Sequence, residues 1–181
     1  MKLLRPVCPL VAMDETLLPC WGGVDNLGGV DGTGDDNWML GLPSDYGRVC
    51  AIKDLGITQT AVLKVKDGEA LVLDGEAVDT VVGRTPSGNA FIARIYSMPD
   101  DASLPAHLKA ITDDDFAAGK STHFVVSTTR LHLFEAGSAG SRSHRNEIVI
   151  DTTPGPYRVV TTNYKPDSET WLLLHLLAIE G

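Results

Sequence analysis

The stretch from Glu147 to Gly181 decides the fold, and it reads EIVIDTTPGPYRVVTTNYKPDSETWLLLHLLAIEG. Its first five residues, 147–151, are rich in β-branched side chains and are soon followed by two prolines and a glycine, which cannot extend a strand ladder. From Tyr157 to Tyr164, alternate residues fall on opposite faces, which is the two-residue period of a strand. Residues 165–168, Lys-Pro-Asp-Ser, then have the chemistry of a turn.

The apolar run from Trp171 to Ile179 completes this stretch as a third element. Nearly every position is apolar, so we expect the run to be buried on both faces, either as a central strand or as a short core helix. Its leucine content favours a helix, but the short turn before it favours a hairpin with the preceding strand. We predict the hairpin and place it in the centre of the sheet.

The rest of the chain is organised as a succession of short strands. Turn signals such as Asp67-Gly68 and 86–89 separate runs that alternate between apolar and polar residues. We expect an edge strand at 6–13, a short helix at 15–18 capped by Asp14, strands at 46–55 (weakly), 59–65, 70–73, 77–83, 90–98 and 123–134, and a helix at 102–112. The predicted class is α+β: a mainly antiparallel β-sheet of meanders and hairpins, forming a sandwich or open barrel, with one or two short helices.

Length and composition set limits on the kind of protein. The 181 residues, 43% of them hydrophobic, suit one domain with a core, so we expect a single domain over 1–181. The net charge of −9, from 24 acidic and 15 basic residues, argues against a nucleic-acid binder, which needs clustered Lys and Arg. No apolar run reaches membrane-spanning length, and the N-terminus lacks the apolar core of a signal peptide. The cysteines Cys8, Cys20 and Cys50 have no CxxC spacing, and we expect reduced, buried thiols in a cytoplasmic protein.

Five short islands of sequence carry a family resemblance through their order. They lie at 17–23 (LLPCWGG), 45–50 (DYGRVC), 68–73 (GEALVL), 154–159 (PGPYRV) and 171–175 (WLLLH). In this succession the chain resembles the Imm21 family of bacterial immunity proteins, which are encoded beside polymorphic toxins. The resemblance offers no catalytic motif to transfer. It implies a protein that binds a cognate toxin domain and occludes it, without catalysis of its own.

Candidate partner-binding residues come from the acidic surface and from one tryptophan, namely Trp21, Asp35, Asp36, Asp113, Asp114 and Asp115. The negative charge either keeps the protein soluble or attracts a basic partner, as in the inhibition of a nuclease-like toxin. Trp21 is expected to anchor the core, whereas a partly exposed tryptophan would be an interface hot spot. The run from Asp113 to Asp115 is either a solvated cap or a pole that meets a basic partner.

The segment from Gly22 to Gly41 is dense in Gly, Asp and Asn and is predicted to be a long loop. Its carboxylates would suit calcium, but the order of an EF-hand and its closing glutamate are absent. The glycines match neither the dinucleotide-binding nor the phosphate-binding spacing. We therefore expect no metal and no cofactor, while a small-molecule or metal-binding module stays open as an alternative function.

Catalytic motifs are missing from the sequence. A hydrolase needs a nucleophile with a base in reach, and the chain has five scattered histidines and no GxSxG motif. The histidines are also too dispersed for a zinc site. His175 lies inside the last apolar run, and we expect it to be a hydrogen-bonded core or rim residue. The prediction is a protein that is not an enzyme; a hydrolase that uses His132 or His175 stays open as a second alternative.

Overall fold

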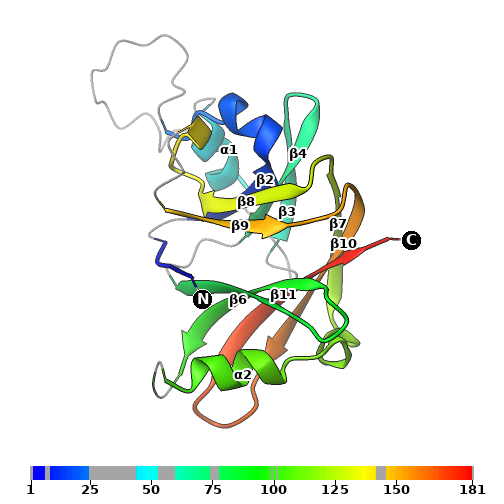
Figure 1. Cartoon of the computed structure of the whole chain (residues 1–181). Coiled ribbons are helices and arrows are strands. Elements are labelled where there is room, and N and C mark those ends of the chain that lie inside the picture. Colours follow the sequence, from blue (N-terminus) through cyan, green and yellow to red (C-terminus); the bar gives the residue numbers. More distant parts are fainter. Residues whose placement is uncertain are drawn as a thin grey trace.

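Two antiparallel sheets face each other and form a sandwich (Figure 1). The computed structural model describes residues 2–6, 9–24, 44–52, 60–73, 78–98, 100, 102–141 and 146–180. The six-stranded sheet has the order β1 (Leu3–Leu4), β5 (Asp79–Arg84), β6 (Ala90–Ser97), β11 (Trp171–Ile179), β10 (Gly155–Tyr164) and β7 (Lys120–Val126). The five-stranded sheet has the order β3 (Thr60–Val65), β4 (Gly68–Leu73), β2 (Leu10–Asp14), β8 (Arg130–Glu135) and β9 (Glu147–Asp151). The predicted fold class is confirmed.

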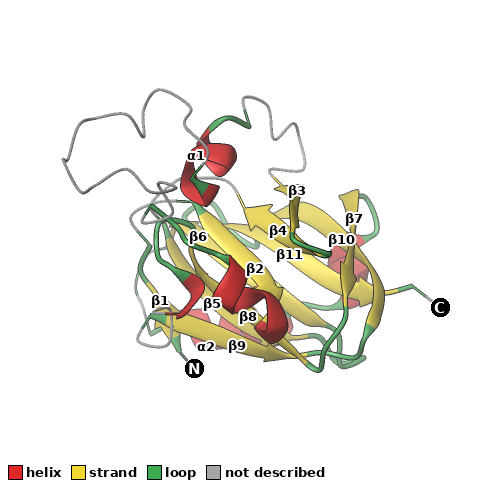
Figure 2. Cartoon of the chain, turned by 90° about the horizontal axis from the view of Figure 1, so that it is seen from above, coloured by secondary structure: helices red, strands yellow, loops and turns green. Residues whose placement is uncertain are grey.

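Short helices lie on the outer face of each sheet (Figure 2). The 3-10 helix η1 (Glu15–Cys20) and the helix α1 (Asp45–Cys50) pack on the five-stranded sheet through residues such as Leu17 and Val49. Helix α2 (Leu104–Ala110) and the 3-10 helix η4 (Asp113–Phe116) pack on the six-stranded sheet through Leu104 and Phe116. None of the helices in the described ranges is long and apolar enough to cross a membrane.

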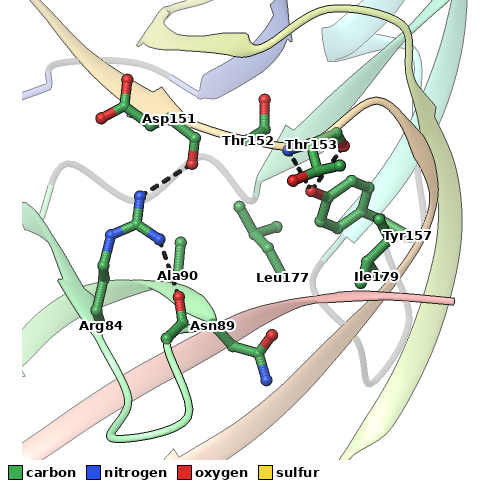
Figure 3. A pocket seen from close by; sticks show the side chains of 10 residues that line it. Arg84, Asn89, Ala90, Asp151, Thr152, Thr153, Tyr157, Leu177 and Ile179 are labelled. Carbon is green, nitrogen blue, oxygen red and sulfur yellow. Dashed lines mark hydrogen bonds between the residues drawn. The ribbon is translucent and has the colours of Figure 1, made fainter. Parts of the chain in front are cut away.

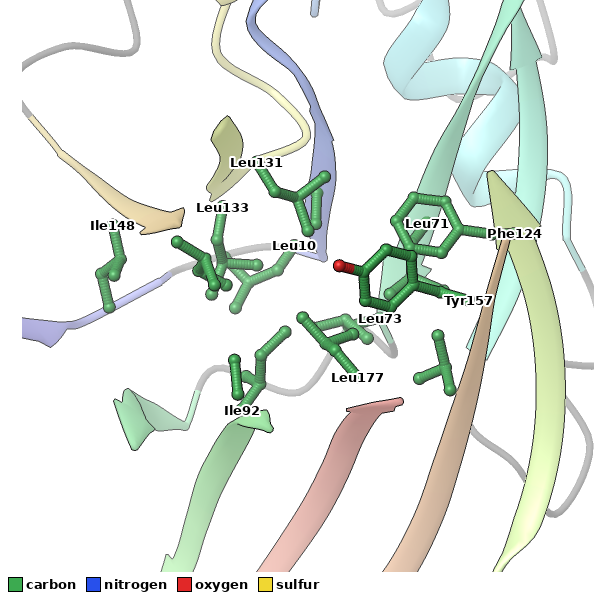
Figure 4. Close-up of a cluster of buried hydrophobic side chains, with 14 of the residues drawn as sticks. Leu10, Leu71, Leu73, Ile92, Phe124, Leu131, Leu133, Ile148, Tyr157 and Leu177 are labelled. Carbon is green, nitrogen blue, oxygen red and sulfur yellow. The ribbon is translucent and has the colours of Figure 1, made fainter. Parts of the chain in front are cut away.

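The central core lies between the two sheets and is built from residues at alternate strand positions (Figure 4). Burying one such leucine or phenylalanine side chain stabilises the fold by about 1.5–3 kcal/mol, so this cluster is a main source of stability. Its larger members are Leu10, Leu71, Leu73, Ile92, Phe124, Leu131, Leu133, Ile148, Tyr157 and Leu177.

The C-terminal hairpin lies inside the six-stranded sheet, as predicted. β10 pairs with β11 from Tyr157 opposite Ile179 to Tyr164 opposite Leu172, and β11 pairs with β6 on its other side. Leu177 of β11 faces the central core, whereas Leu174 faces the helices. Both faces of β11 are therefore covered, which accounts for apolar side chains at successive positions. The run forms a strand and not a helix.

The single strand predicted at 123–134 is wrong, because two strands in different sheets occupy this region. β7 ends at Val126, and β8 begins at Arg130. The carboxylate of Asp14 accepts hydrogen bonds from the backbone N–H groups of Ser127 (2.7 Å) and Thr128 (3.2 Å). These bonds hold the connection between the sheets. The same carboxylate is therefore not used to cap η1, which has no side-chain cap.

Two further strand predictions are wrong. The strand expected at the edge is β2, which lies in the middle of its sheet between β4 and β8. Pro9 precedes β2, so its missing N–H does not interrupt the ladder. The weak strand expected at 46–55 is helical over 45–50, where the hydroxyl of Ser44 caps α1 by accepting a hydrogen bond from Gly47 N–H (2.9 Å).

One side of the sandwich is joined by side chains that link the edge strand β7 to the other sheet. Oε2 of Glu69, on β4, accepts a hydrogen bond from the backbone N–H of Val125 at 2.8 Å. The hydroxyl oxygens of Thr60 on β3 and Thr122 on β7 are 2.8 Å apart. An edge amide of β7 is thus satisfied by a carboxylate instead of a neighbouring strand.

Candidate functional site

Trp21, one of the sequence-predicted partner-binding residues, is a core residue. Its side chain is 1% exposed, and its Nε1–H donates to the carbonyl of Ala136 at 3.0 Å. It packs in the cluster between η1, α1 and the five-stranded sheet. Trp21 therefore offers no surface to a partner, because the chain after η1 turns the indole inward. Asp35 and Asp36 lie outside the described residues, as does most of the predicted loop 22–41.

The acidic run Asp113 to Asp115 forms the start of η4, and two of its carboxylates bind within the chain. Oδ1 of Asp113 accepts hydrogen bonds from Asn89 Nδ2 (2.9 Å) and from the Thr85 hydroxyl (3.2 Å). Burial raises the pKa of Asp113, but the hydrogen bonds together outweigh it and hold this pKa below its ordinary value. Oδ2 of Asp115 accepts the backbone N–H of Thr112 at 2.8 Å, while Asp114 is exposed. The run therefore caps η4 and fixes the 85–89 turn.

A cavity of about 320 Å³ lies at the end of the central core, where the chain crosses from β9 to β10 (Figure 3). Arg84 donates from Nη1 to the carbonyl of Gly88 (2.9 Å) and from Nη2 to that of Asp151 (3.0 Å). The Tyr157 hydroxyl donates to the carbonyl of Thr153 (2.9 Å) and accepts its N–H (3.0 Å). A ligand site needs polar groups that converge on the ligand, but these groups bind one another. The bond from Arg84 to Asp151 links β5 of one sheet to β9 of the other, so these polar groups are better explained as a connection between the sheets than as a ligand site.

The histidines considered for a hydrolase are buried structural residues. Oγ1 of Thr161 lies 2.9 Å from Nδ1 of His175, the spacing of a nucleophile and its base, but these residues are 5% and 0% exposed. Burial, followed by the charge of Arg94, lowers the pKa of His175 to about 3, so the ring is a weak base. His132 lies in the other sheet, with Nδ1 2.9 Å from Oε2 of Glu147. The prediction that His175 is a hydrogen-bonded core residue is confirmed.

Metal ligands do not gather within the described part of the chain: there, no group of three or more His, Cys, Asp or Glu residues is placed to hold an ion. Cys20 and Cys50 are free thiols. The expected burial holds in part for Cys20, which is partly buried, and is wrong for Cys50, which is exposed. Cys8 lies outside the described residues.

An exposed aromatic surface lies where β6, β10 and β11 end together, around Trp171. The indole is 37% exposed and stacks on Tyr96, with ring centroids 4.6 Å apart and planes inclined by 23°. Its Nε1–H donates to Oδ1 of Asn163 at 2.9 Å. The Lys165 ammonium lies 4.6 Å from the ring centroid. We call Tyr96, Asn163, Lys165 and Trp171, together with Asp167 and Glu169 of the turn between β10 and β11, the Trp171 surface.

The turn that carries this surface is held by its own hydrogen bonds. Oδ1 of Asp167 accepts the backbone N–H groups of Glu169 (2.9 Å) and Thr170 (2.7 Å), and Oδ2 accepts the Thr170 hydroxyl (3.1 Å). These backbone bonds lower the pKa of Asp167 below its ordinary value. The hydroxyl of Ser97, on β6, donates to the carbonyl of Glu169 at 2.6 Å. The surface is therefore ordered before any partner arrives.

The surroundings of this turn are acidic. Burial is the largest influence that raises the pKa of the Tyr164 hydroxyl, and the carboxylates of Asp115 and Asp167 raise it further. Asp115 of η4 and Asp167 of the turn thus act on the same side chain, although they are far apart in sequence. Nε2 of His107 lies 3.9 Å from Oδ2 of Asp167.

Sequence reasoning missed the Trp171 surface because it assigned the whole run 171–179 to the interior. Trp171 is the first residue of β11, and it is followed by an irregularity in the pairing with β6. The sequence signal was a tryptophan directly after a polar turn, where strand ends meet solvent. A preorganised, partly exposed aromatic group that also has a polar handle is suited to anchor a protein partner.

Comparison with known proteins identifies a family. The family model described as Immunity protein 21 matches residues 7–170. This range includes four of the sequence islands and ends just before Trp171, so the island at 171–175 lies outside it. No curated protein and no solved structure matches the chain significantly.

Proposed function

The chain belongs to the immunity protein 21 family, and from this membership we propose that it binds a cognate toxin domain and blocks it without catalysis of its own. The family match over residues 7–170 is the observation that carries the proposal. The toxin, rather than a small substrate, is the proposed partner, because the cavity near the crossing from β9 to β10 is lined by groups that bind one another.

Occlusion is the mechanism that this structure supports best. An inhibitor of this kind covers the active site or substrate groove of its target with a rigid surface, and a few aromatic or charged residues contribute most of the binding energy. The Trp171 surface has an ordered turn, an exposed indole and carboxylates beside it. It is therefore the part of the described chain that we propose as the anchor.

The net charge of −9 supports a basic target. Opposite charges speed the encounter of two proteins over distances of about 10 Å at moderate salt. As an immunity protein of a bacterial polymorphic toxin system, it would meet its target in the cytoplasm of the producing cell; this localisation is part of the proposal.

The test is to combine the purified chain with the toxin domain encoded beside its gene and to measure toxin activity against the amount of chain added. Occlusion predicts that inhibition is complete at equal molar amounts, that a one-to-one complex forms, and that the complex weakens as salt increases. A chain that removed toxicity at far less than equal amounts would be acting as an enzyme. A chain that neither bound nor inhibited that toxin would contradict the proposal for this pair.

A further inference from the structure

The indole of Trp171 already holds a cation from its own chain. β11 lies between β6 and β10, so Tyr96 of β6 and Lys165, which follows β10, approach the indole from the strands on either side of β11. Lys165 belongs to an exposed turn and approaches the ring to 4.6 Å from its centroid. Such a contact at an exposed site is weak, and a cation that becomes desolvated against the same ring binds more strongly.

The charges around this ring favour a cation from outside over an anion. Asp167 and Glu169 lie in the turn that precedes Trp171, and the carboxylate of Asp115 acts on Tyr164 from η4. Lys165 is the positive charge of the turn itself, and its ammonium group lies over the ring. An acidic partner would meet several carboxylates here, whereas a basic partner would meet complementary charge.

On the basis of the proposed immunity function, we infer that the Trp171 surface receives an arginine or lysine side chain of a basic protein partner, which replaces Lys165 on the indole. Arginine suits the site better, because its planar, weakly hydrated guanidinium stacks on aromatic rings and also pairs with carboxylates. Glu169 is exposed, two residues before Trp171 in the chain, and supplies a carboxylate for such a pair. The Asp167 turn and the Tyr96 stack are already in place, so only Lys165 has to move.

A first experiment tests this chemistry without the toxin. A short labelled peptide of alternating glycine and arginine is titrated into the full-length chain at low salt, and its dissociation constant is measured by fluorescence anisotropy. Trp171→Ala is expected to weaken binding by roughly 5-fold, and Lys165→Ala to tighten it by roughly 2–5-fold, the range of an exposed cation–aromatic contact. Glu169→Gln is expected to weaken binding by about 2-fold.

Matched controls separate the indole from charge in general. A peptide with citrulline in place of each arginine keeps the shape without the charge and is expected not to bind. Lys120→Ala removes a positive charge from the exposed start of β7, and Asp114→Asn removes a negative charge from η4. If Lys120→Ala tightened binding as much as Lys165→Ala, or if Trp171→Ala bound the peptide as the unaltered chain does, the inference would be overturned. Because Lys165→Ala removes neither Tyr96 nor Asn163, the other partners of the indole, it decides the question even if Trp171→Ala fails to fold.

A second experiment uses the neighbouring toxin and keeps the two proposals apart. Loss of at least 10-fold in affinity on Trp171→Ala, with Val149→Ala (an exposed apolar residue on β9) unchanged, supports the inference. Equal binding by both variants refutes the Trp171 contact but leaves the immunity function standing. Failure of the unaltered chain to bind the toxin contradicts the function instead, and the peptide titration still decides the surface chemistry. A Trp171-dependent doubling of mass in light scattering would show that a second copy occupies the surface, which refutes the inference.

Discussion

Asp14 and Thr128 join the two sheets: the Asp14 carboxylate, at the end of β2, accepts hydrogen bonds from both the backbone N–H (3.2 Å) and the hydroxyl (2.9 Å) of Thr128. The carboxylate also accepts the N–H of Ser127 and is 2% exposed. One buried side chain thus satisfies two amides in the connection where the chain passes from β7 in one sheet to β8 in the other.

Asp14→Ala is expected to lower the free energy of unfolding by about 2–4 kcal/mol, because it leaves these amides without their charged acceptor. Urea denaturation at neutral pH measures the effect. Asp14→Asn retains an acceptor oxygen and should cost less. An alanine variant as stable as the unaltered protein would show that solvent replaces the carboxylate.

The buried ring of His175 predicts a dependence of stability on pH. Its pKa is about 3 in the folded chain, below the ordinary 6.5, so between these values the unfolded chain binds a proton that the folded chain does not. The free energy of unfolding should therefore fall as pH decreases through this window, and His175 should contribute about 1.4 kcal/mol per pH unit to that fall. Above pH 6.5, the contribution of His175 should no longer depend on pH. Urea unfolding at pH 7, 6 and 5 should show a shallower fall in the free energy of unfolding for His175→Gln than for the unaltered protein.

Replacing the two described tryptophans is expected to affect stability to very different extents. Trp21→Ala should destabilise the fold by about 3–5 kcal/mol, because it opens a cavity and leaves the Ala136 carbonyl without its donor. Trp171→Ala loses a partly exposed stack and should cost about 1 kcal/mol. Thermal and urea unfolding compare them. A large loss at Trp171 would indicate a structural role and remove the reason to assign it to binding.

The acidic run of η4 should be uneven in its contribution to stability. Asp113→Ala removes the acceptor of Asn89 and Thr85, and it should cost about 1–2 kcal/mol. Asp114→Ala, at an exposed position, should change the free energy of unfolding by less than about 0.5 kcal/mol. Equal effects of the two substitutions in urea denaturation would mean that the hydrogen bonds of Asp113 add nothing to stability beyond the charge of the carboxylate.

Two glycines with positive φ allow the cost of backbone strain to be distinguished from the cost of a steric clash with an added Cβ. Gly23 has φ +60°, and an added Cβ would lie 2.5 Å from the carbonyl oxygen of Gly137. Gly88 has φ +96°, but nothing lies within 4 Å of the same position. Gly88→Ala should therefore cost about 1–2 kcal/mol from the backbone alone, and Gly23→Ala clearly more. Similar losses in urea denaturation would mean that the chain near Gly137 yields to the added methyl group.

Much of the fold was readable from local pattern. The alternating runs at 59–65, 77–83 and 90–98 correspond to β3, β5 and β6, and the helix expected at 102–112 corresponds to α2. The errors lie where a tertiary partner overrides the pattern. The 123–134 run is rich in Phe, Val and Thr throughout. It divides into two strands where Asp14, more than one hundred residues earlier, accepts hydrogen bonds from the amides at its middle.

The candidate site was less predictable than the fold, because exposure depends on neighbours. Trp21 and Trp171 both adjoin polar or glycine-rich turns, yet the first is 1% and the second 37% exposed. Trp21 is covered by residues of η1, α1 and the five-stranded sheet. No local sequence feature predicts that these elements pack together. Trp171 lies at one end of its sheet, where β6 and β10 stop and β11 begins.

The sequence by itself determined the strand-rich class, the C-terminal hairpin and the family resemblance, which the immunity protein 21 match over residues 7–170 confirms. These follow from side-chain periodicity and turn chemistry, which act over a few residues. Only the tertiary structure decided which strands share a sheet, which tryptophan is buried, and where Tyr96, Lys165 and Trp171 come together. Those outcomes depend on contacts between residues distant in the chain, and a local pattern carries no information about which distant surfaces will exclude water together.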